Sequence, residues 1–151
     1  MTRWARAKPW LPVLVWAGVI STLSTDTFSS ERTSALIIPT LHWLIPHASN
    51  ETLLLIHAVI RKTAHLTEYF ILGILLYRAL RGDERGWNLK LAVWAIAIAA
   101  AYASLDEFHQ SFVSSRTASP WDALIDTVGA FAAQIVLRLW NIRKVNVTSD
   151  P

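Results

Sequence analysis

The chain has 151 residues, the length of one domain, and we treat residues 1–151 as a single integral membrane domain. Hydrophobic residues make up 53% of it and it has eight tryptophans, a composition that excludes an ordinary soluble domain and indicates a bilayer protein with tryptophan at the interfaces. The net charge of +3 is compatible with nucleic acid or with membrane orientation, and the lack of cysteine excludes disulfides and thiolate metal sites.

The first apolar segment, at about residues 10–25, is interrupted only by Pro12. It is short for a membrane span, which needs ~20 residues. A signal peptide is the alternative, because a basic start and a short apolar core are typical of one. No small-x-small cleavage pattern follows it, so we predict an uncleaved first span.

The next connection, residues 26–49, has two parts. Residues 25–34 are rich in serine, threonine and acidic groups and predict turns, whereas residues 35–46 are apolar but broken by Pro39 and Pro46. The apolar part is too short to cross a bilayer. We therefore predict an interfacial or re-entrant segment here.

A long helix is predicted after residue 49, with Asn50 as its N-cap. A helix from residue 51 to residue 80 would be ~45 Å long, which exceeds the ~30 Å of hydrocarbon. The second span, at about residues 58–80, therefore includes a charged stretch. His65 and Glu68 are placed within the outer half of the membrane.

Two further spans are predicted at about residues 89–107 and 120–140, the last starting with Ser119 and Pro120 as cap and first residue. Basic residues lie before the first span, between the second and third, and after the fourth. The positive-inside rule then makes these regions cytoplasmic. The predicted fold is an all-α, four-helix transmembrane bundle with both termini in the cytoplasm. Because topology accounts for the positive charge, we expect no nucleic-acid partner.

This topology brings the start of the second span, the end of the third and the start of the fourth to the outer face. Ionisable groups at such depth cost ~2.5–3.5 kcal/mol each and normally pair inside the bundle. Acids outnumber cations in this layer, which predicts a protonated carboxylate, a bound cation or an acid–histidinium pair. The acid–base candidates are His65, Glu68, Asp106 and His109. The candidate ligand-binding residues are Lys62, Glu107, Gln110, Arg116, Asp122 and Asp126.

Several interpretations of this polar layer remain open. A divalent metal could bind at His65, Glu68, Asp106 and His109, although the first pair lacks the spacing of known zinc helices, and an internal salt-bridge network is the alternative. His109 with Asp106 could be an acid–base pair or a helix-end hydrogen bond. Below the acids of the fourth span lie Gly129 and Ala133. These small residues predict close approach of a neighbouring helix.

The segment from Arg61 to Tyr69, the motif Asp106-Glu-Phe-His-Gln110, and Arg116, Asp122 and Gly129 in that order and spacing resemble the VanZ-like family. The resemblance covers roughly residues 55–135. It implies a small multi-span protein of the bacterial cytoplasmic membrane, in a family whose founding member is associated with teicoplanin resistance. The positions that the family pattern marks are Lys62, His65, Glu68, Asp106, Glu107, His109, Gln110, Arg116 and Asp122.

The chain departs from the family pattern at three places. Ser114 and Ser115 stand where Pro-Gly is expected, Asp126 where asparagine is frequent, and Ala133 where glycine is common. The first departure affects the geometry of the loop before Arg116. The second implies that an ionised Asp126 is not required for chemistry.

Three functional hypotheses follow. In the first, the polar layer binds or modifies an anionic lipid-linked envelope intermediate, with Arg116 and Lys62 on its phosphate, and contributes to glycopeptide resistance. In the second, the layer only joins helices in a structural or membrane-organising protein. The third is proton or cation passage, which the apolar cytoplasmic halves of the spans disfavour.

Overall fold

The computed structural model describes residues 7–25, 30–112 and 119–149, and all regular structure within them is helical. The predicted all-α class is therefore confirmed. The elements are η1 (Lys8–Trp10), α2 (Leu11–Leu23), α3 (Ser30–Leu44), α4 (Asn50–Arg81), α5 (Leu89–Gln110) and α6 (Pro120–Ser149).

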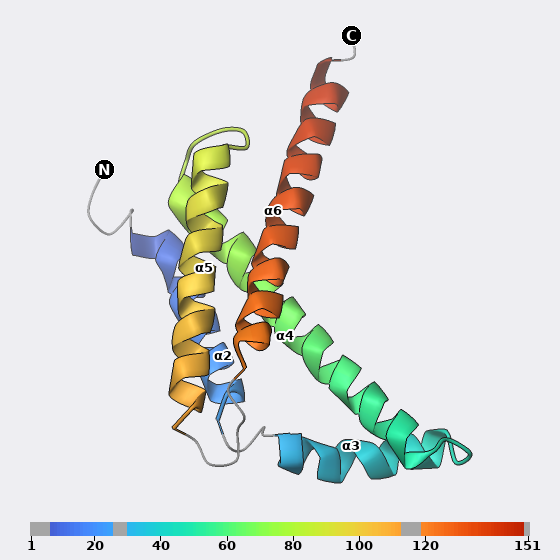
Figure 1. Ribbon diagram of the computed structural model, residues 1–151. Helices are drawn as coiled ribbons and strands as arrows, with labels where there is room; N and C mark the ends of the chain where they lie inside the picture. Colours follow the sequence, from blue (N-terminus) through green and yellow to red (C-terminus); the bar gives the residue numbers. More distant parts are fainter. Residues whose placement is uncertain (1–6, 26–29, 113–118, 150–151) are drawn as a thin grey trace.

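The helices α2, α4, α5 and α6 form the body of the molecule, and α3 lies across one end of it (Figure 1). α4 crosses the others obliquely, and its first half extends away from α5 to meet α3. The start of α2, the α4–α5 connection and the last turns of α6 share the opposite end. This is the relative placement that the predicted topology requires.

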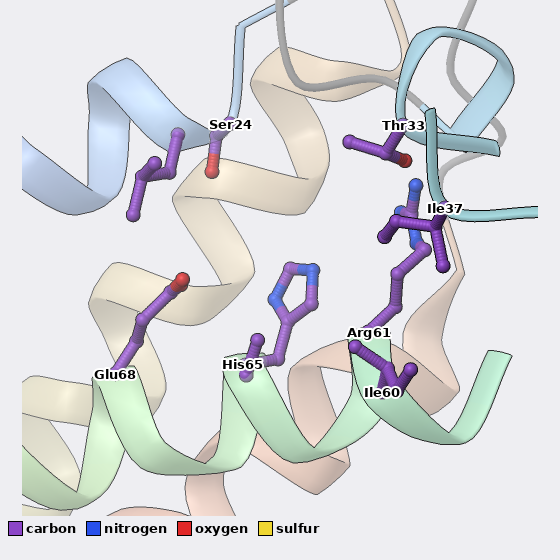
Figure 2. Close-up of a pocket in the computed structure, with 9 residues that line it drawn as sticks. Ser24, Thr33, Ile37, Ile60, Arg61, His65 and Glu68 are labelled. Atoms are coloured by element: carbon purple, nitrogen blue, oxygen red, sulfur yellow. The ribbon is translucent and has the colours of Figure 1, made fainter. Parts of the chain in front are cut away.

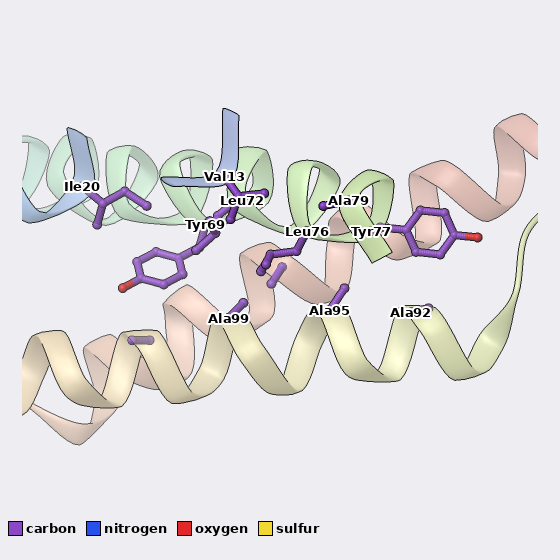
Figure 3. Packing of buried hydrophobic residues seen from close by; sticks show 12 residues of the cluster. Val13, Ile20, Tyr69, Leu72, Leu76, Tyr77, Ala79, Ala92, Ala95 and Ala99 are labelled. Atoms are coloured by element: carbon purple, nitrogen blue, oxygen red, sulfur yellow. The ribbon is translucent and has the colours of Figure 1, made fainter. Parts of the chain in front are cut away.

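The apolar core lies where α4 packs against α2 and α5. Alanines at steps of three and four form one face of α5, and larger side chains from α4 and α2 fill the space opposite (Figure 3). Tyr69 is completely buried in this core, and Leu72 and Leu76 are nearly so. The small face of α5 lets the helices approach closely and leads directly to the polar end of the same helix.

A close helix contact joins α4 to α6. A Cβ added at Gly129 would lie 2.4 Å from the carbonyl oxygen of Leu66, and one added at Gly73 would lie 2.9 Å from Cα of Ala130. Ala133 also packs here and is completely buried. The predicted close-packing stripe on the fourth apolar segment is confirmed, and it fixes the α6 acids against α4.

Hydrogen bonds hold α2 against its neighbours. The Tyr102 hydroxyl donates to the carbonyl of Ala17 at 2.7 Å and accepts from Ser21 at 2.7 Å. The indole of Trp16 donates to the carbonyl of Glu68 at 2.9 Å. These bonds join α2 to α5 and α4 and set its position relative to the polar end.

Two local predictions are wrong. The N-cap of α4 is Ser49, whose hydroxyl accepts from the amide of Thr52 at 3.2 Å, so Asn50 is the first helical residue. The stretch predicted as turns is partly helical, because α3 begins at Ser30 and continues through Pro39. A proline removes one backbone donor but is tolerated in a helix whose other contacts support it.

Two helical stretches are long and apolar enough to cross a membrane: Leu89–Gln110 and Pro120–Arg143. The first apolar helix, Lys8–Leu23, is shorter than a span. α4 has the length of one, but its ionisable residues give it a lower hydropathy than the other two. The four-span bundle thus stays a prediction for α2 and α4.

Candidate functional site

The polar residues of α4, α5 and α6 meet as the sequence predicts, and Ser24 at the end of α2 joins them. Asp106 on α5 lies at the centre of one group, where its Oδ2 accepts from the hydroxyl of Ser24 at 2.6 Å and from the amide of Gln110 at 2.8 Å. Ser24 and Gln110 are both buried. Because buried donors need partners, Asp106 joins α2 to α5 by bonds that are expensive to lose.

Glu107 links α5 to the start of α6. Its Oε2 accepts from the backbone amide of Ser119 at 2.8 Å, and its side chain is buried. The first amides of a helix have no partner within the helix, and a carboxylate there is favoured by the helix dipole. Glu107 thus caps the start of α6 from a different helix. Its Oε2 atom is occupied by this structural hydrogen bond.

Lys62 and Asp122 join α4 to α6 at the rim of the cluster. Their Nζ and Oδ1 atoms are 2.8 Å apart, and the two side chains are 54% and 32% exposed. An ion pair this exposed contributes little stability. It does show where the side chain of Lys62 points, which is toward Asp122 in the first turn of α6.

His65 and Asp126 form the most buried polar contact of the cluster. Asp126 is 1% exposed, and its Oδ1 lies 3.5 Å from Nδ1 of His65. That separation is longer than an ordinary hydrogen bond, and both atoms are buried without a hydrogen-bond partner. The pair is therefore positioned for a bond that a small movement or a bound group would complete.

A pocket of about 180 Å³ lies between α2, α3 and α4, directly beside this pair. Arg61, His65 and Glu68 project into it from successive turns of α4 (Figure 2). Ser24 of α2 and Thr33 of α3 face them from the other side. The rest of the lining is apolar and consists of Leu23, Ile37, Ile60 and Ala64.

Arg61 is the cation of this pocket, and it was not among the predicted site residues. Its Nη1 atom is buried and has no hydrogen-bond partner. The spacing of Arg61, His65 and Glu68 at i, i+4 and i+7 is the signal that could have found it, since such residues share one helix face. The prediction instead named the adjacent residue, Lys62, as a ligand-binding candidate.

The remaining predicted residues fall into two groups. His109 is exposed at the end of α5 and is not part of the cluster around Asp106, whose carboxylate bonds to Ser24 and Gln110. Among the described residues, the predicted contact between His109 and Asp106 is therefore absent. Arg116, with Ser114 and Ser115 before it, lies outside the described residues.

No group of three or more histidine, cysteine, aspartate or glutamate side chains is arranged to hold a metal ion within residues 7–25, 30–112 and 119–149. Asp106 and Glu107 have committed oxygens, as described above. The divalent metal that the sequence left as one possibility at His65, Glu68, Asp106 and His109 gains no support from the described residues. What the pocket offers instead is one guanidinium, one imidazole backed by a buried carboxylate, and one further carboxylate.

These residues together define an all-helical protein with two membrane-span candidates and a polar pocket at one end of its helices. The model of the VanZ/LLP1 family matches residues 10–141, which include every described residue of the pocket. The chain belongs to this family. Comparisons with curated proteins and with solved structures find no match.

Proposed function

We propose that the protein is a multi-pass protein of the bacterial cytoplasmic membrane in which α2, α4, α5 and α6 span the bilayer and α3 lies at its outer surface. The surface of the candidate spans supports this, because only 28% of each apolar window is buried within the protein. A core helix of a soluble protein would bury most of such a window. Exposed side chains such as Phe131 and Leu139 need a lipid environment.

We further propose that the pocket of Arg61, His65 and Glu68 binds the phosphate of an anionic lipid-linked envelope precursor. The single observation that carries this is that Arg61 lines the pocket and that its buried Nη1 atom has no hydrogen-bond partner. A buried donor without a partner costs ~1–3 kcal/mol, and more when it is charged. A phosphate oxygen would provide the missing acceptor in the geometry that guanidinium favours.

The size and lining of the pocket favour a phosphate attached to a lipid chain. About 180 Å³ holds the volume of roughly six water molecules, enough for a phosphate but too small for an attached glycan. The apolar lining residues Leu23, Ile37 and Ile60 suit the first carbons of an isoprenoid or acyl chain. The glycan would extend outward, past α3.

Substituting Arg61 tests this proposal. The full-length protein in neutral detergent is titrated with a polyprenyl phosphate, and binding is followed by native mass spectrometry. Arg61→Gln removes a charge-assisted hydrogen bond worth ~1.5–3 kcal/mol, so we expect affinity to fall by ~10-fold to 100-fold. Equal affinity of the variant and the parent protein would refute phosphate binding at this pocket.

Lys62→Gln is the matched control. It removes the same charge from the adjacent residue of the same helix, but Lys62 bonds to Asp122 and does not line the pocket. We expect this variant to bind as the parent protein does. Loss of binding in both variants would mean that overall charge, rather than the pocket, attracts the lipid.

The His65–Asp126 pair extends the proposal from binding to chemistry. A carboxylate behind an imidazole fixes its orientation and stabilises its protonated form, which suits His65 to exchange a proton with a bound ligand. Turnover of a lipid-linked substrate by the purified protein, lost in His65→Gln with binding retained, would establish an enzyme. Binding without turnover would establish a carrier or shielding protein.

A second candidate function is a structural or membrane-organising role, which the helix-joining bonds of Asp106, Glu107 and Lys62 favour. It predicts that pocket variants lower folded yield and biological function together. Expression in a teicoplanin-sensitive bacterium separates the two roles. If Arg61→Gln folds normally but no longer raises resistance, the pocket itself acts; if neither protein raises resistance, a resistance role is ruled out.

A further inference from the structure

A second pocket lies at the opposite end of the helices, between the start of α2 and the end of α4. It has a volume of about 460 Å³, and its lining includes Lys8, Arg78 and Arg81. Pro9, Pro12 and Leu75 form its apolar walls, and Gly82 closes its edge. No acidic residue is among the described residues that line it.

The charges of these three cations are the second observation. None of them forms an ion pair within the part of the chain that the structure describes. The Nε atom of Arg81 is buried and has no hydrogen-bond partner. Like charges that converge on one pocket repel each other, and a bound anion would remove that repulsion.

The end of α4 explains only part of this arrangement. Basic residues in the last turn of a helix are favoured by its dipole, which accounts for Arg78 and Arg81 in sequence. The dipole does not account for Lys8, which comes from η1, or for the buried Nε of Arg81. A concave site built from two separate elements points to a ligand.

We propose that Lys8, Arg78 and Arg81 bind a phosphate group, and that its source is the headgroup of an anionic membrane lipid. The pocket lies at the end of the helices that carries the basic connection between α4 and α5, which the positive-inside rule places at the cytoplasmic leaflet. Basic pockets between helices on that side are typical headgroup sites. The apolar walls suit the glycerol and first acyl carbons.

The experiment uses the full-length protein in neutral detergent, titrated with phosphatidylglycerol and, separately, with phosphatidylcholine, and read by native mass spectrometry. We expect saturable binding of the anionic lipid only. Each cation near a phosphate surface contributes ~1 kcal/mol, or ~5-fold, so Arg78→Gln with Arg81→Gln should weaken binding by ~25-fold.

The matched control removes the same charge from the same end. Arg85→Gln with Lys90→Gln changes two exposed cations outside the pocket lining, and it should leave affinity close to that of the parent protein. Equal losses in both double variants would overturn the proposal in favour of unspecific attraction. Equal binding by the parent protein and the pocket variant would overturn it as well.

Inorganic phosphate distinguishes the two sources of the ligand. If millimolar phosphate leaves phosphatidylglycerol bound, the lipid headgroup is the ligand, as proposed. If free phosphate displaces the lipid and itself binds in a manner that depends on Arg78 and Arg81, the lipid source is refuted and the site binds a soluble anion. Arg61→Gln should not alter any of these results, since it lies at the other end, so this test is independent of the proposed function.

Discussion

Replacing Gly129 by alanine should separate α4 from α6 and disturb the candidate site. The added Cβ would lie 2.4 Å from the Leu66 carbonyl oxygen, about 1 Å short of the ordinary contact range of 3.4–4 Å. The obstructing atom belongs to a helix backbone and cannot rotate away. Overpacking of this kind costs ~1–3 kcal/mol. At ~2–4 °C per kcal/mol, the thermal midpoint in detergent should fall by ~2–12 °C.

Gly18→Ala is the control for this experiment. Nothing lies within 4 Å of a Cβ at Gly18, so the substitution only improves helix propensity, by ~1 kcal/mol. The two variants make the same chemical change and should shift the midpoint in opposite directions. Because Leu66 follows His65, Gly129→Ala should also weaken lipid binding at the pocket. A midpoint equal to or above that of the parent protein would refute the close contact.

Three further substitutions test the polar contacts. Asp106→Ala leaves two buried donors without an acceptor and should lower stability by ~2–4 kcal/mol in chemical unfolding, whereas Asp83→Ala in the exposed loop should have little effect. Tyr102→Phe removes the hydroxyl that joins α2 to α5 and should cost ~1–2 kcal/mol; an unchanged unfolding midpoint would contradict that role. Burial and the nearby charge of Arg61 lower the pKa of His57 from its ordinary value of 6.5, so the folded state favours neutral His57. The contribution of neutral His57 to the free energy of unfolding is therefore complete above pH 6.5 and is lost as the pH falls. In His57→Gln, the free energy of unfolding should fall less steeply on acidification than in the parent protein. An identical pH dependence in the two proteins would exclude the effect.

Local patterns predicted most of the fold. The length of α4, the start of α6 at Pro120 and the small residues of α6 are all visible in the sequence, because each depends on neighbouring residues of one helix. The sequence also predicted that the polar ends meet, because spans that run in alternating directions bring those ends to one side. α3 was predicted poorly, because its helix continues through Pro39 with support from contacts to α4.

The rotation of each helix about its own axis could not be predicted in the same way. Side chains of successive helical residues point ~100° apart, so an error in the predicted rotation of a helix places the wrong one of two adjacent residues in the site. Arg61 therefore lines the pocket while Lys62 faces α6, and Gln110 is buried while His109 is exposed. Packing against other helices decides these rotations, and the close approach of Gly129 to Leu66 is one such contact between α4 and α6.

These rotations also decide which residues line the pocket and which only join helices. The surplus of acids in the sequence predicted a protonated carboxylate, a bound cation or an acid–histidinium pair. In the structure, Asp106, Glu107 and Asp122 bond to partners in the protein. The pocket itself contains Arg61 and His65, each with a buried nitrogen that has no hydrogen-bond partner, against a single acid, Glu68. The guanidinium of Arg61 would repel a cation and could donate hydrogen bonds to an anion, whereas the Nδ1 atom of His65 faces Asp126. Asp106, Glu107 and Asp122 thus hold the helices in place, and Arg61 is left as the cation of the pocket for which we propose an anionic ligand.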